Sequence, residues 1–204
     1  MRHEPALFCL VLSIVAVGCS SQNFNVGSVA APDAGDSSDA GPAPLDPIAL
    51  NNSWTYSVTV AGTYPSCTDG TFASTVTQHA PTDGRDAFLV TSFCPGVGDF
   101  WFSSVGDEVS EDISHQWVVA LDTPIEDGHT WSNGTEMFIW HSAGTVNVTA
   151  GTFADCWEVD DATPGGGAAY YAVTFCRGIG PVKWHVRDAS QNGYDAVLTQ
   201  KNIN

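Results

Sequence analysis

The sequence predicts an all-β protein: a single antiparallel meander domain of about ten strands, whose curved sheet closes to a barrel or half-barrel. Three observations support this prediction. No window of useful length carries apolar residues at helical spacing, and period-two alternation recurs instead. The gaps contain turn-forming pairs such as Asp83-Gly84, Asn133-Gly134 and Asn192-Gly193. Short strands joined by tight turns favour a meander, and a β-sandwich is the alternative way to bury them.

The alternation is clearest in three segments. Apolar side chains share one face of residues 53–60, of residues 182–186 and of residues 194–199, and polar side chains share the other. Further strands are expected near residues 71–78, 86–94, 99–104, 115–121, 135–140, 144–149, 153–159 and 169–176.

The acidic stretch 107–112 is expected to be a solvated loop. Carboxylates are ligands that calcium accepts, but this stretch lacks the spaced D-x-D-x-D-G order of a dedicated calcium loop. Alternation would also point some of its carboxylates apart. No CxxC pair or Cys/His cluster has zinc spacing, so we expect no metal site.

The N-terminus carries a short apolar run from about Ala6 to Val17. This run is shorter than the roughly 20 residues that span a bilayer, which is typical of a signal peptide, here residues 1–18. It ends at Gly18-Cys19 and resembles the bacterial lipobox. The resemblance implies that Cys19 is the lipid attachment site, carrying acyl chains such as palmitate. An ordinary signal peptide cut nearby is the alternative.

Residues 19–46 are expected to form the lipidated cysteine and a disordered tether. Ser, Ala, Gly, Pro, Asp and Asn dominate this stretch, so it cannot bury enough apolar surface to offset the entropy of ordering it. Residues 47–204 then form the all-β domain. Ser20 directly after the cysteine resembles the sorting pattern of Gram-negative outer-membrane lipoproteins, which implies an outer-membrane location in the cell envelope.

The chain is strongly acidic, with 23 Asp and Glu against 6 Lys and Arg and a formal net charge of −17. This charge argues against nucleic acid as a partner and against direct binding to anionic lipid headgroups. It favours solubility, cationic partners or divalent cations.

Four cysteines remain in the domain once the two N-terminal ones are set aside, and an even number in an exported domain indicates disulfides. Strand parity places Cys156 and Cys176 on the less apolar face of two sequence-adjacent strands, where a cross-strand bridge is possible. Cys67–Cys94 is then the remaining pair. The other connectivities are less local and stay open.

No catalytic nucleophile is apparent. Ser110 lies near His115 and acidic residues, but it has no nucleophile elbow around it. The domain histidines are isolated in the sequence and are expected at the surface or as caps: His79, His115, His129, His141 and His185.

The aromatic residues are the best functional lead. Phe100, Trp101 and Phe102 are consecutive, so a strand must aim Trp101 away from the other two. Large apolar groups on both faces indicate either a covered second face or an apolar cleft, and core packing is the favoured explanation. The candidate ligand or core aromatics are Trp101, Trp140, Trp157 and Trp184.

Four segments resemble a family of bacterial envelope lipoproteins of unassigned function. The most specific is 148–156 (VTAGTFADC), followed by 177–183 (RGIGPVK); NSWTY at 52–56 and DGHTW at 127–131 are also similar. The resemblance implies an architecture related to lipoprotein-carrier-type curved sheets, which hold a hydrophobic ligand in a concave face.

We therefore expect a non-enzymatic cell-envelope lipoprotein that needs no cofactor and whose β-domain binds a hydrophobic ligand or a protein partner. The membrane is a partner only through the lipid on Cys19. The alternatives are a structural or surface-interaction lipoprotein without a cleft and, third, a secreted hydrolase.

Overall fold

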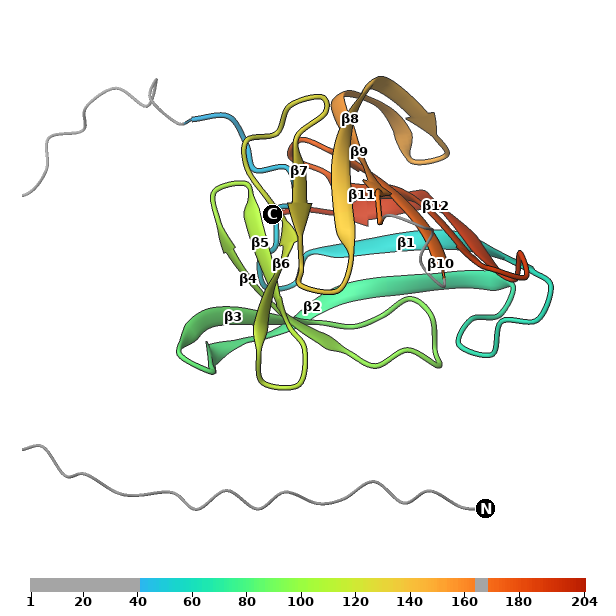
Figure 1. Cartoon of the computed structure of the whole chain (residues 1–204), viewed down its shortest axis with the longest axis horizontal. Helices are drawn as coiled ribbons and strands as arrows, with labels where there is room; N and C mark the ends of the chain where they lie inside the picture. Colours follow the sequence, from blue (N-terminus) through green and yellow to red (C-terminus); the bar gives the residue numbers. More distant parts are fainter. Residues whose placement is uncertain (1–40, 164–168) are drawn as a thin grey trace, which may run out of the picture. The chain divides into compact units, whose positions relative to one another are not determined.

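Twelve antiparallel strands form one nearly closed, barrel-like sheet in this computed structural model, which describes residues 41–163 and 169–204 (Figure 1). The predicted all-β, barrel-like fold class is confirmed. Within the described ranges, no helix is long and apolar enough to cross a bilayer. The strands are β1 (Ser53–Ala61), β2 (Gly70–Thr82), β3 (Arg85–Val90), β4 (Phe100–Val105), β5 (Glu108–Asp112), β6 (Trp117–Leu121), β7 (Thr130–Ser132), β8 (Met137–Val148), β9 (Gly151–Asp161), β10 (Ala169–Cys176), β11 (Gly180–Asp188) and β12 (Gly193–Asn202).

The strand order explains how the sheet closes. The chain begins in the middle of the sheet at β1, proceeds outward strand by strand to β6, and crosses to β7 at the opposite edge. It then returns strand by strand to β12, which pairs with β1. The two edge strands, β6 and β7, are thus consecutive in the chain, and no ladder joins them in the described residues. A barrel with a single gap leaves only two short edges unpaired.

Two hairpins have the turn chemistry that the sequence predicts. Asp83-Gly84 connects β2 to β3 and Gly106-Asp107 connects β4 to β5. Asp83, Gly84 and Gly106 all have positive φ angles, of 44°, 81° and 64°. Such angles match the twist of tight hairpins, and glycine adopts them without a steric cost.

Three expectations about the strands differ from the structure. The runs near 135–140 and 144–149 belong to one long strand, β8, whose register shifts around Gly144. The three-residue strand β7 was too short to leave a periodic pattern. The solvated loop expected over 107–112 is wrong, because residues 108–112 form β5. There Val109 and Glu111 alternate with Ser110, so the stretch is half-buried rather than solvated.

The packed part of the chain extends beyond the expected domain boundary at residue 47. We call residues 43–48 the lead-in segment, because the chain reaches β1 through them. Leu45 is fully buried, and its backbone N–H donates to Asp107 Oδ1 at 2.8 Å. The backbone carbonyl of Pro44 accepts from Gly178 N–H at 2.8 Å. The lead-in segment therefore lies against the β4–β5 and β10–β11 turns. Cys19 and residues up to 40 lie outside the described residues.

Both predicted disulfides, Cys67–Cys94 and Cys156–Cys176, are present. Cys156 and Cys176 lie directly opposite each other in the β9–β10 ladder. The expectation that they occupy the less apolar face is wrong, because both are completely buried in a hydrophobic cluster. For Cys156 the error has a local cause: the φ of 52° at Asp155 interrupts the alternation of β9, so strand parity does not carry through it.

Candidate ligand-binding cavity

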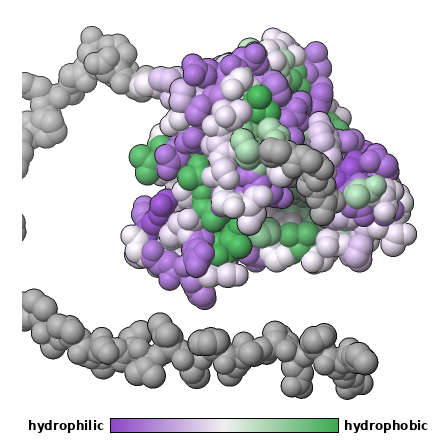
Figure 2. Space-filling model, in the orientation of Figure 1, coloured by the Kyte–Doolittle hydropathy of each residue, from purple (hydrophilic) through white to green (hydrophobic). Residues whose placement is uncertain are grey.

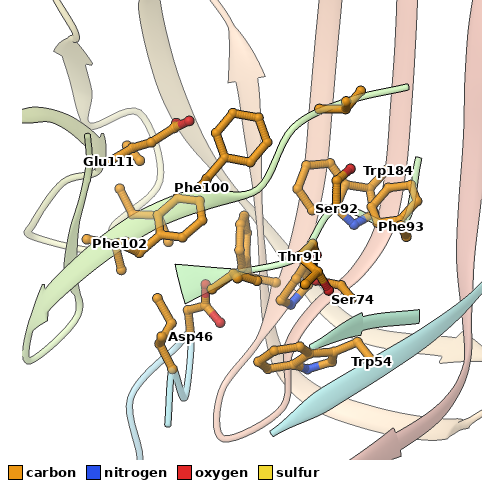
Figure 3. A pocket seen from close by; sticks show the side chains of 18 of the residues that line it. Asp46, Trp54, Ser74, Thr91, Ser92, Phe93, Phe100, Phe102, Glu111 and Trp184 are labelled. Carbon is orange, nitrogen blue, oxygen red and sulfur yellow. Dashed lines mark hydrogen bonds between the residues drawn. The ribbon is translucent and has the colours of Figure 1, made fainter. Parts of the chain in front are cut away.

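A cavity of about 300 Å³ lies inside the barrel (Figure 3). Its wall comes from the lead-in segment, from nine strands (β1–β6 and β10–β12), and from the loop between β3 and β4. Nine of the lining side chains are aromatic: Trp54, Tyr56, Phe93, Phe100, Phe102, Tyr171, Phe175, Trp184 and Tyr194. A pocket of this size and character is at the lower end of the range that small-molecule sites occupy.

Strand alternation places these aromatic rings. Phe100 and Phe102 of β4 both face the cavity, whereas Trp101 between them does not line it, as the sequence predicts. On β1, Trp54 and Tyr56 share the inward face in the same way. Figure 3 shows Phe100 and Phe102 on one side of the cavity, with the Trp54, Phe93 and Trp184 rings on the other.

The loop between β3 and β4 is held in place by covalent and hydrogen bonds. Cys94 in this loop forms the disulfide to Cys67, and Gly96 N–H donates to the Ser66 carbonyl at 2.9 Å. Phe93 is thereby fixed over the cavity. Its ring centroid lies 4.7 Å from that of Tyr56 and 5.4 Å from that of Trp184.

Asp46 brings a carboxyl group into this aromatic environment. Its Oδ1 is sealed from solvent and has no hydrogen-bond partner. It lies against Gly180, where an added Cβ would be 2.9 Å from Oδ1 and 3.1 Å from Trp54 Nε1. Burial raises the pKa of the Asp46 carboxyl to about 7. The absence of a side chain at Gly180 therefore makes room for the acid.

Glu111 supplies a second carboxyl group from β5 (Figure 3). Burial, and after it the neighbouring Asp112 carboxylate, raises the pKa of Glu111 to about 7. Burial also raises the pKa of the Tyr171 hydroxyl, with smaller contributions from Glu111 and Asp46. Both carboxyl groups thus act on the same tyrosine.

The other polar groups of the cavity differ in whether they have partners. Trp54 Nε1 donates to the Ile179 carbonyl, and the Tyr56 hydroxyl donates to the Pro181 carbonyl at 2.8 Å. Trp184 Nε1 is buried and makes no hydrogen bond of normal geometry. No Lys, Arg or His lines the cavity in the described part of the chain. Among the described residues, the cavity wall therefore contains two acids and no base.

The four tryptophans predicted as ligand or core residues have different positions. Only Trp184 lines the cavity. Trp140 is fully buried and donates to the Asp122 carbonyl at 2.9 Å, so it is a core residue. Trp157 is partly buried and packs against the hydrophobic cluster that contains Trp140. Trp101 is partly buried on the face of β4 that points away from the cavity.

Sequence reasoning missed most of the cavity. The inward alternation of residues 54–60 was visible, but nothing in the sequence shows which inward faces leave a space between them. By sequence alone, Asp46 falls in the expected tether and Glu111 in the expected solvated loop. Their only sequence signal is that each stands two residues from an apolar inward-facing residue, Ile48 and Val109 respectively.

Each of the five domain histidines lies beside an aspartate. The pairs are His79–Asp86, His115–Asp83, His129–Asp122, His141 with Asp127 and Asp160, and His185–Asp195. None forms a catalytic arrangement with Ser110, whose Oγ instead accepts from Arg85 Nη1 at 2.8 Å.

Among the described residues, one group of side chains is close enough together to hold a metal ion. Ligand atoms of Asp83, Asp112 and His115 lie within 4.8 Å of one another. Asp83 and His115 are exposed, and His115 Nδ1 lies 3.0 Å from Asp83 Oδ2. That hydrogen bond raises the pKa of the His115 imidazole. The hydrogen bond to Asp83 accounts for the position of His115 without an ion.

The outer surface has no comparable apolar site in the described residues. The large exposed hydrophobic side chains are scattered: Leu50, Val105, Ile113, Met137 and Tyr170. Figure 2 shows one face of the domain, on which hydrophilic residues predominate and hydrophobic ones form small separate patches. Isolated exposed hydrophobic residues are normal on soluble domains and do not mark a binding surface.

No protein-family model and no curated protein matches the chain. Two solved structures are similar. One is a Bacteroides fragilis protein inferred to be exported, with a YmcC-like fold: 14% identical, TM-score 0.44, covering 78% of this chain and 99% of that one. The other, from Parabacteroides distasonis, is inferred to be a lipoprotein: 11% identical, TM-score 0.42, covering 79% and 100%. At these scores the likenesses establish neither a shared family nor a shared function.

Proposed function

We propose that this protein is a non-enzymatic lipoprotein of the cell envelope, anchored through Cys19, whose barrel binds a small, largely apolar molecule. The observation that carries the proposal is the interior cavity of about 300 Å³ with nine aromatic side chains in its wall. The lipid anchor and the outer-membrane location rest on the sequence around Cys19 and Ser20.

The energetics of packing support a bound ligand. Protein interiors are as densely packed as organic crystals, and voids much larger than a water molecule are few. An apolar cavity of this size gives up contacts that a ligand restores. Asp46 Oδ1 adds a second cost, because a buried polar atom without a partner loses about 1–3 kcal/mol.

The electrostatics of the cavity favour binding over glycoside hydrolysis. Enzymes that use two carboxyl groups hold their pKa values apart, so that one is an acid while the other is an ionised nucleophile or base. Asp46 and Glu111 both have a pKa of about 7. Burial therefore does not keep one carboxyl group protonated while the other is ionised, as a catalytic pair requires.

The proposal also favours a small ligand over a protein partner. The described outer surface offers scattered hydrophobic residues rather than a continuous patch, whereas the aromatic side chains converge inside the barrel.

Titration of the purified protein with N-phenyl-1-naphthylamine, a neutral apolar dye, tests the proposal. Trp54 and Trp184 in the cavity wall can transfer excitation energy to a dye bound there. We expect saturable binding of one dye per chain. Ala120→Phe, which fills the cavity, should raise the Kd at least tenfold, and Val105→Phe, on an exposed position, should leave it unchanged. Absence of saturable binding, or equal Kd values for both variants, would reject the proposal.

A further inference from the structure

The charge inside the cavity is one-sided. Asp46 and Glu111 line it together with Tyr56, Tyr171 and Tyr194, and no basic side chain of the described residues lies in its wall. Asp46 Oδ1 has no donor at all. A carboxylate in an apolar interior is costly unless a positive charge or several donors accompany it. Since the described residues put no positive charge in the cavity wall, a bound cation would supply one.

The rest of the wall suits a cation as well as an apolar body. The face of an aromatic ring attracts a cation within about 6 Å, and tryptophan is the most effective ring. Trp54 lies beside Asp46 against Gly180, and Trp184 and Phe93 lie together in another part of the cavity wall (Figure 3). A cation with an apolar body inside the cavity would therefore have both a carboxyl group and aromatic side chains in its surroundings.

We propose that the ligand of this cavity is a small organic cation, an ammonium group on an apolar body, with the ammonium paired to Asp46 and the body packed among the aromatic rings. This inference rests on the proposed function, since it names the class of molecule that the same cavity takes. Glu111, on the opposite side of the cavity, adds a second negative charge to the site.

The overall charge of the chain also favours a cationic ligand. With a net charge of −17, the protein attracts cations and repels anions at long range.

Cation binding is also coupled to proton release, because an ammonium group beside Asp46 favours the ionised carboxylate. Since the pKa of both acids is about 7 in the empty cavity, a cation should bind more tightly as the pH rises from 6 to 8.

Three probes of nearly equal size test the inference by calorimetry on the purified full-length protein. They are 1-naphthylmethylammonium, which is cationic, 1-naphthalenemethanol, which is neutral, and 1-naphthoate, which is anionic. At pH 8 we expect the ammonium probe to bind at least tenfold more tightly than the alcohol, and the naphthoate not to bind. The heat of ammonium binding should also depend on the ionisation enthalpy of the buffer at pH 7, which reports proton release.

Two variants locate the charge. Asp46→Asn keeps the shape of the side chain and should abolish the preference for ammonium over alcohol. Asp99→Asn removes the same charge from an exposed position next to Phe100 and should keep the preference. Equal affinity of wild type for ammonium and alcohol, or full preference in Asp46→Asn, overturns the inference but leaves the proposed function standing. If neither these probes nor the neutral dye bind, both fail.

Discussion

Arg177, on the turn between β10 and β11, contacts both carboxylate oxygens of Asp107, on the turn between β4 and β5, at 3.0 and 2.9 Å. The two residues come from opposite halves of the sheet. Arg177 Nη1 also donates to the Ala43 carbonyl at 3.0 Å, and Asp107 Oδ1 accepts from Leu45 N–H. One ion pair thus joins the two halves and fixes the lead-in segment between them.

We expect Arg177→Met to lower the free energy of unfolding by about 1–3 kcal/mol, because it leaves a partly buried Asp107 carboxylate without its partner. Lys183→Met, at an exposed position of β11, is the control and should change stability by less than about 0.5 kcal/mol. Urea unfolding followed by tryptophan fluorescence measures both. A similar loss in the two variants would mean that the ion pair contributes nothing specific.

Gly180→Ala should destabilise the protein by about 2–4 kcal/mol. The residue has φ of 87°, and its new Cβ would press on Asp46 Oδ1 and Trp54 Nε1. Gly84→Ala is a matched control, since its φ of 81° is similar but nothing lies within 4 Å of the added Cβ. It should cost only about 1 kcal/mol, the backbone component alone. Thermal unfolding that gives equal losses would exclude crowding at Asp46.

Stability should fall as the pH rises from about 4 to about 7. The pKa values of Asp46 and Glu111 are higher in the folded than in the unfolded protein, so the folded protein binds more protons in this window. The penalty is fully present above pH 7 and amounts to on the order of 2–4 kcal/mol for Asp46. Below about pH 4 the trend reverses, because hydrogen bonds from Trp157 and Asn192 lower the pKa values of Asp155 and Asp188.

The variant Asp46→Asn/Glu111→Gln should remove most of this slope and be more stable than wild type at pH 8. Asp99→Asn should keep the wild-type slope. Urea unfolding at intervals of half a pH unit from 4 to 8 gives the comparison. A double variant with the same slope as wild type would show that other groups cause it.

The two disulfides should differ in their effect on the cavity. Replacing either pair by alanines should cost about 2–4 kcal/mol of stability. Only Cys67→Ala/Cys94→Ala should also raise the Kd of the neutral dye, because that bond holds the loop that carries Phe93. Cys156→Ala/Cys176→Ala removes a bridge between β9 and β10, which the strand ladder also holds together, so the cavity wall should keep its shape. Equal binding by both variants would contradict this account.

Cys19→Ala should release the protein from the membrane fraction of the producing cells, because the proposed acyl chains could no longer be attached. Fractionation followed by immunoblotting measures the distribution, and Cys9→Ala is the control within the predicted signal peptide. Retention of Cys19→Ala in membranes would exclude the lipid anchor.

Much of the fold could be predicted because it depends on local patterns. Alternation in β1 and β4 showed which rings share a face, and Asp83-Gly84 showed where a hairpin turns. The disulfide pairing could also be predicted from the sequence. The burial of Cys156 could not, because the positive φ at Asp155 reverses the alternation of inward- and outward-facing residues in β9.

The cavity could not be predicted for a different reason. Its wall combines Asp46, Glu111 and Trp184, which are far apart in the chain and meet only when the barrel closes. An acidic residue next to Leu45 looks like part of a polar tether until Leu45 is seen fully buried. Whether the inward-facing side chains fill the interior of the barrel depends on the curvature of the whole sheet. No local sequence pattern reports that curvature.

The lead-in segment also has a mechanical consequence. Any pull on the chain ahead of residue 43 reaches the hydrogen bonds of Ala43, Pro44 and Leu45 before it reaches Asp46. These bonds attach to two different turns and share the load, with the buried Leu45 side chain behind them. A pull on the preceding chain is therefore opposed by these hydrogen bonds before it reaches Asp46 and the cavity wall.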